Sequence, residues 1–274
     1  IKTAERAQIW QTTSELRYIF RHSLLREAVY DMQLKTRIKS LHKLIAQAIE
    51  KVHAEKLEDK YVDLVFHYEQ AGVPSKLRLY LEKAADRARD YYQNQQALRY
   101  YTKLADLLQK DNDSAAVARV LLKKAEVLEL IGQWADCEDV CRQALSASQS
   151  AGNDTLIGQS YYRLGHLLML KGNYDQANSH LQYAAVFFDA SGNDEGMAQV
   201  YGDLGNLNFR QGRYDDAKLY FIRSIQLSQK HPHHRATANI VATLGLTYMN
   251  IGKYDDGIGW QQSQLEVCKR LNDR

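Results

Sequence analysis

Apolar and polar positions repeat every 40 residues across the second half of the chain. The repeat is marked by evenly spaced glycines and by an aromatic residue two positions after each, namely Gly132, Gly172, Gly212 and Gly252 with Trp134, Tyr174, Tyr214 and Tyr254. A Leu-Gly pair also ends seven residues before each of the last three glycines. A fixed period of this length predicts an array of stacked structural repeats.

Each repeat is predicted to be a pair of helices. In residues 155–194, apolar side chains such as Leu164 and Leu168 recur at helical spacing and predict a first helix. Gly172 then suits the left-handed residue just past a helix end, and a second helix is expected over about Tyr174–Ala190. One such pair cannot bury both of its faces, so it needs neighbours, and a solenoid results.

The first part of the chain is less regular. Two β-prone runs, Ile9–Gln11 and Leu16–Phe20, flank the polar Thr12–Ser14 and predict a small hairpin. A helix is expected from near Leu34 to His53, with Leu41, Leu44 and Ile45 on its buried side. We therefore predict an N-terminal segment at 1–33, degenerate helical hairpins at 34–114 and four regular repeats at 115–274, bounded as 115–154, 155–194, 195–234 and 235–274.

The regular part resembles the tetratricopeptide repeat. The Leu-Gly pair, the glycine turn followed by an aromatic, and the alanine of the second helix with a large apolar residue four positions later (Cys141, Leu181, Phe221) all fit that family. The unit of 40 residues exceeds the usual unit of about 34 and lacks its closing proline, as in the long-helix repeats of bacterial signalling regulators and some eukaryotic adaptors. The resemblance implies an all-α, right-handed α-α superhelix, preceded by a small β-hairpin and helical linker.

A second resemblance covers about Tyr18–Gly72. The stretch Tyr18–Tyr30, then Leu41-His42 and Ile45–Glu50, is similar to a linker of bacterial STAND-type signalling ATPases, which are often fused to class III adenylate-guanylate cyclases. It implies that residues 1–33 are the remnant of a winged-helix-like module. Because the chain begins at Ile1 without a methionine, we expect an upstream portion, and the resemblance implies that this portion of the full-length protein contains a signalling domain. Neither a phosphate loop nor a dinucleotide fingerprint is present, so the resemblance supplies architecture and no active site.

Composition narrows the class of protein. The 274 residues are 45% hydrophobic and 25% charged, and no apolar run approaches the length of about 20 residues that spans a bilayer. Three cysteines in this length favour a reducing compartment, and we predict a cytoplasmic protein with no membrane contact. The net charge of +3 is too small to imply nucleic acid, although residues 1–60 hold a basic excess.

The sequence offers little for catalysis. His231, His233 and His234 surround a proline in a loop, a poor frame for a metal, and Cys137 and Cys141 occupy inward positions of their repeat. No carboxylate stands at a convincing spacing from a histidine or nucleophile. We predict a non-enzyme with no cofactor and no metal.

Binding is the more productive hypothesis. Stacked pairs of helices curve, so the first helices line a concave groove. Carried over from the resembled family, the groove residues are Arg119, Lys123, Glu126, Gln159, Tyr162, Arg163, His166, Gln199, Asp203, Asn206, Arg210, Asn239, Thr243, Met249 and Asn250. Amide and guanidinium groups there can bond the backbone of an extended peptide, and arginine can pair with its carboxylates.

We therefore predict a protein- or peptide-binding scaffold or sensor arm of a larger bacterial signal-transduction protein. One alternative is a free-standing receptor of the peptide-pheromone type with long repeats. The other is a regulator that binds nucleic acid through its basic N-terminal segment, where Lys35, Arg37, Lys39 and Lys43 cluster; the cluster fits the solvated face of a helix better, so nucleic acid is not the expected partner.

Overall fold

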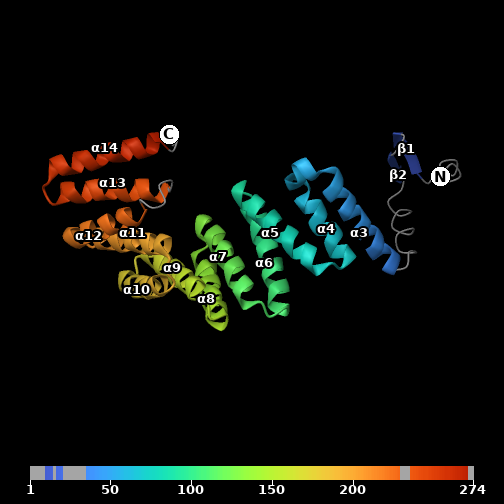
Figure 1. Cartoon of the computed structure of the whole chain (residues 1–274), viewed down its shortest axis with the longest axis horizontal. Helices are drawn as coiled ribbons and strands as arrows, with labels where there is room; N and C mark the ends of the chain where they lie inside the picture. Colours follow the sequence, from blue (N-terminus) through green and yellow to red (C-terminus); the bar gives the residue numbers. More distant parts are fainter. Residues whose placement is uncertain (1–9, 15–16, 21–34, 229–234, 271–274) are drawn as a thin grey trace. The chain divides into compact units, whose positions relative to one another are not determined.

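The chain folds into a series of antiparallel helices (Figure 1). The computed structural model describes residues 10–14, 17–20, 35–228 and 235–270. Contacts divide the chain into two compact units, Ile1–Gln93 and Asn94–Arg274, and each is described by itself.

The first unit begins with a two-stranded hairpin. Strand β1 (Trp10–Ser14) pairs antiparallel with β2 (Arg17–Phe20), and Trp10 lies opposite Phe20. The polar stretch Thr12–Ser14 belongs to β1 and not to the predicted turn, because β-branched threonine fits a pleated strand well. Most of the linker-like stretch Tyr18–Tyr30 lies outside the described residues.

Helix α3 (Lys35–Val52) forms where it was expected, but its buried face differs from the prediction. His42 and Ala46 are buried, whereas Leu41, Leu44 and Ile45 are each more than two-fifths exposed. In the described residues α3 packs chiefly against the helices that follow it, so only a narrow strip of its surface is covered.

The other helices of the first unit are the 3-10 turn η1 (Ala54–Lys60), α4 (Tyr61–Ala71) and α5 (Pro74–Asp90). Polar contacts tie α4 and α5 to α3. Glu50 accepts hydrogen bonds from the Tyr80 hydroxyl at 2.5 Å and the Lys76 ammonium at 2.8 Å. His42 and His67 approach each other through their Nδ1 atoms at 2.8 Å.

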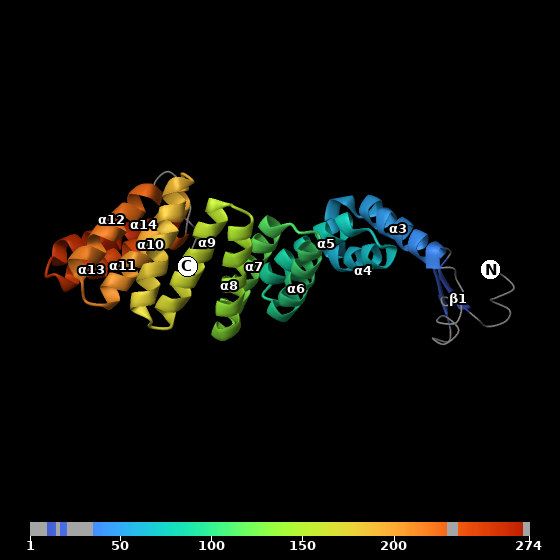
Figure 2. The same ribbon diagram turned by 90° about the horizontal axis from the view of Figure 1, so that it is seen from below.

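The second unit contains α6 (Asn94–Lys110) and four helix pairs. The pairs are α7 (Ser114–Leu130) with α8 (Trp134–Ser150), α9 (Asp154–Leu170) with α10 (Tyr174–Ala190), α11 (Asp194–Arg210) with α12 (Tyr214–Ser228), and α13 (Arg235–Asn250) with α14 (Tyr254–Arg270). Figure 2 shows the paired helices packed side by side, and the first helix of each pair also contacts the first helix of the next.

The 40-residue period has a simple structural origin. Each of α7 to α11 is 17 residues long and is followed by a three-residue turn, so one helix and its turn occupy 20 residues. The middle residue of each turn is left-handed, with φ of +81° at Gly172 and +63° at Gly192. Asn112 takes the same conformation with φ of +57°, which asparagine tolerates better than most residues.

Small residues let large ones fill the space between helices. The ring of Phe188, 1% exposed, lies where a Cβ on Gly158 or on Gly196 would approach it to 2.8 Å. This ring therefore wedges α10 between α9 and α11, and it makes the two repeats share one core. Asn193 closes the junction, because its side chain accepts a hydrogen bond from the Gly196 amide at 2.9 Å and caps α11.

Candidate binding groove

A hollow of about 280 Å³ lies on the first helices of three successive repeats. It is lined by Arg119, Leu122, Lys123, Glu126, Gln159, Tyr162, Arg163 and Gln199. All of these except Leu122 belong to the predicted groove set. The 40-residue period places them together, because residues at matching positions of α7, α9 and α11 share one face of the array.

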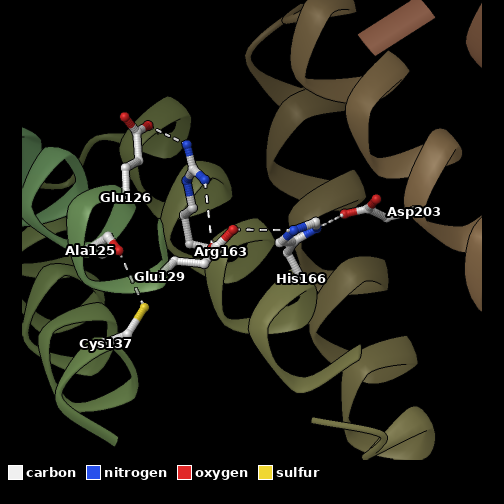
Figure 3. Close-up of polar contacts among 7 residues, drawn as sticks. All are labelled: Ala125, Glu126, Glu129, Cys137, Arg163, His166 and Asp203. Carbon is white, nitrogen blue, oxygen red and sulfur yellow. Dashed lines mark hydrogen bonds and ion pairs between the residues drawn. The ribbon is translucent and has the colours of Figure 1, made fainter. Parts of the chain in front are cut away.

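Charged side chains connect the three helices beside this hollow (Figure 3). Arg163 on α9 pairs with Glu126 through Nη2, and its Nη1 lies 3.9 Å from Oε2 of Glu129. Next to it, His166 places Nε2 3.4 Å from Oε1 of Glu129 and Nδ1 2.6 Å from Oδ2 of Asp203. The network therefore runs from α7 through α9 to α11.

Burial and charge act in opposite directions on these groups. Burial lowers the pKa of His166, but hydrogen bonds to Asp203 and Glu129 outweigh it and raise that pKa to about 10. Burial raises the pKa of Glu129, but the His166 hydrogen bond and the charges of His166 and Arg163 bring it below its ordinary value. His166 is accordingly a cation at neutral pH and bridges two carboxylates.

Sequence reasoning missed this network. It found no convincing pairing of a carboxylate with a histidine, and it left Glu129 out of the groove set. The partners are separated by 37 residues, as in Glu126–Arg163 and His166–Asp203. That separation is one repeat less about one helical turn, because neighbouring first helices are offset along their axes. A search of the sequence for oppositely charged residues 37 positions apart, three fewer than the 40-residue period, could have found these pairs.

Several predicted groove residues are occupied within the protein. Asp203 is only 6% exposed and is held by His166. On α13, Thr243 donates to the Asn239 carbonyl and Asn250 donates to the Leu246 carbonyl, each within the helix. Met249 packs toward α14, because its Cγ lies 2.7 Å from where a Cβ on Gly257 would be.

The remaining two predicted residues lie farther along α11. Asn206 is half-buried and Arg210 is exposed at the end of the helix. The predicted residues that line the hollow lie on α7, α9 and the first half of α11.

The two cysteines whose surroundings the structure describes, Cys137 and Cys141, are both buried. The Cys137 thiol donates to the Ala125 carbonyl at 3.4 Å. The hydrogen bond with Cys137, together with burial, raises the pKa of Cys141. Among the described residues no group of three or more potential ligands can hold a metal, and His231, His233 and His234 lie outside them. No helix in the described ranges is long and apolar enough to cross a membrane.

Part of this helical array matches a known repeat family. Residues 156–230 match the model of the tetratricopeptide repeat. The matched stretch covers most of α9 and all of α10 to α12, which contain Phe188 and three of the five residues of the charged network. The chain thus carries a tetratricopeptide-repeat region. No curated protein matches the chain by sequence.

Solved structures agree on the fold. A Rap protein complexed with competence and sporulation factor has a TM-score of 0.65 at 17% identity, covering 91% of this chain and 70% of that one. The apo form of RapI gives 0.65 at 13% identity, covering 92% and 71%. BtubC from P. vanneervenii gives 0.60 at 15% identity, covering 88% and 94%. The predicted fold class, an all-α array of tetratricopeptide repeats, is confirmed.

Proposed function

We propose that this protein is a non-catalytic scaffold that binds an extended segment of another protein, or a peptide, along the first helices of its repeats. The observation that carries the proposal is the hollow on α7, α9 and α11, into which seven predicted polar or charged side chains converge. Convergent amides and guanidinium groups suit an extended backbone, whose donors and acceptors recur along the strand.

The fold gives further support. Tetratricopeptide arrays expose long surfaces on which a partner can lie, because each repeat contacts only its neighbours. The Rap structure of similar fold is itself a complex with a factor. In the hollow the described residues place no nucleophile beside a base, and Arg163 pairs with Glu126.

We further propose that the chain is the sensor arm of a cytoplasmic bacterial signalling protein with an ATPase upstream. This rests on the similarity of the stretches Tyr18–Tyr30, Leu41-His42 and Ile45–Glu50 to the linker of such proteins. Occupation of the groove would then bias the upstream switch. A natural gene without an ATPase module would refute this context and favour a free-standing receptor.

Binding in the groove is tested by capturing partners on the immobilised protein. The groove variant is Gln159→Ala/Gln199→Ala, in which two half-buried amides of the hollow are removed. The matched control is Gln182→Ala/Gln226→Ala, which removes two exposed amides from the second helices α10 and α12. We expect partners, identified by mass spectrometry, to be lost from the groove variant and kept by the control. Equal retention by both variants would place binding elsewhere.

A further inference from the structure

The hollow carries an excess of positive charge. Its lining includes three basic side chains, Arg119, Lys123 and Arg163, against the single carboxylate of Glu126. Leu122 and the ring of Tyr162 add apolar surface beside the two glutamine amides. A site with this charge favours an anionic group, while the amides can satisfy the backbone on either side of it.

Arg163 is the basic group of this lining whose present carboxylate partner also lines the hollow. Its Nη1 lies 3.9 Å from Oε2 of Glu129, which is beyond hydrogen-bonding distance. Glu129 is held instead by His166. The close partner of Arg163 is therefore Glu126, which lines the same hollow.

The pair of Arg163 and Glu126 is exchangeable. The Glu126 side chain is 38% exposed and that of Arg163 26% exposed, so water screens their attraction. An ion pair that water reaches in part contributes less to stability than a buried one, because its charges regain hydration when they separate. A carboxylate from outside can thus replace Glu126 on the guanidinium, while Glu129 and His166 stay in place behind it.

We propose that the hollow takes an aspartate or glutamate side chain of an extended partner segment, and that Glu126 is a built-in competitor which occupies Arg163 until that carboxylate displaces it. The inference rests on the proposed function and names the chemistry of its ligand. Because Glu126 is on α7 and Arg163 on α9, ligand binding exchanges a contact between two repeats for a contact with the partner.

The test begins with a phage-displayed library of random twelve-residue peptides, selected on the wild-type protein and counter-selected on the Gln159→Ala/Gln199→Ala variant. An enriched peptide is then labelled with a fluorophore, and its affinity is measured by anisotropy. Each acidic residue of the peptide is replaced in turn by its amide. We expect one such replacement to weaken binding about tenfold, as a charge-assisted contact requires.

Protein variants assign that contact. With Arg163→Gln, replacement of the acidic residue should no longer matter, because the guanidinium that reads it is gone. Glu126→Gln keeps every cation of the network, so we expect this variant to fold. It should bind the acidic peptide about five times more tightly than the wild type does, and it should bind the amide analogue no more tightly. Glu138→Gln is the control, since Glu138 on α8 pairs with Arg142 of the same helix and with Lys171 in the turn after α9, and none of these three residues lines the hollow.

The outcomes separate the two proposals. Peptides that bind the groove without an acidic position, or an affinity that Glu126→Gln leaves unchanged, would overturn the competitor and leave the scaffold intact. Failure to enrich any peptide over the groove variant would refute the groove itself, and with it both proposals.

Discussion

His166 should make a pH-dependent contribution to stability, and His166→Gln should abolish it. Burial lowers the pKa of His166, but its bonds to Asp203 and Glu129 prevail and raise it to about 10, above the ordinary 6.5. A group whose pKa is raised in the folded state stabilises that state fully below the unfolded value. The stabilisation is therefore complete below about pH 6.5 and is lost as the pH rises through about 10.

The magnitude follows from the same interval. Each pH unit between the two pKa values corresponds to about 1.4 kcal/mol, so the upper limit is roughly 5 kcal/mol. The His166 side chain is 23% exposed, so solvent screens the bridge. After that discount we expect a free energy of unfolding about 2 kcal/mol lower in the variant at pH 7, and a difference below about 0.5 kcal/mol near pH 10.

Urea denaturation followed by circular dichroism measures this difference at pH 7, 8.5 and 9.5. His180→Gln is the matched control, because burial lowers the pKa of His180 and keeps it neutral throughout this range. The difference between the control and wild type should not change with pH. If the difference for His166→Gln were equally constant, His166 would not be held as a cation between the two carboxylates, and the reasoning would fail.

Two further predictions concern packing and the first unit. A Cβ on Gly205 would lie 2.6 Å from ring carbons of the fully buried Phe221, so Gly205→Ala should lower the free energy of unfolding by about 1–3 kcal/mol. Gly212 lies in open space at φ +74°, so Gly212→Ala should lower it by about 1 kcal/mol through the backbone alone. A larger loss for Gly212→Ala than for Gly205→Ala would contradict this ranking. Burial lowers the pKa of His42 and His67, so protonation opposes folding and the stability of the first unit falls as the pH drops below 6.5. The rate of amide hydrogen exchange in residues 35–71, corrected for intrinsic rates, should therefore rise from pH 7 to pH 5 in the wild type. It should rise less in His67→Phe.

The sequence alone determined the repeat architecture. Evenly spaced turn residues such as Gly172 report a local requirement, a left-handed backbone at the end of a helix, and that requirement is met within a few residues of chain. The period, the helix pairs and the residues that share the groove face follow from this spacing. The second helix predicted at about Tyr174–Ala190 has these same bounds as α10 in the structure.

Only the tertiary structure decided how the groove residues pair. Whether Arg163 faces solvent or Glu126 depends on the axial offset between neighbouring first helices, and that offset is set by wedges such as Phe188. A difference of one helical turn exchanges one partner for another without changing the repeat pattern. For the same reason Met249 packs against α14, and the apolar side of α3 stays exposed: burial depends on which neighbour is present, and a helix's own sequence does not specify that neighbour.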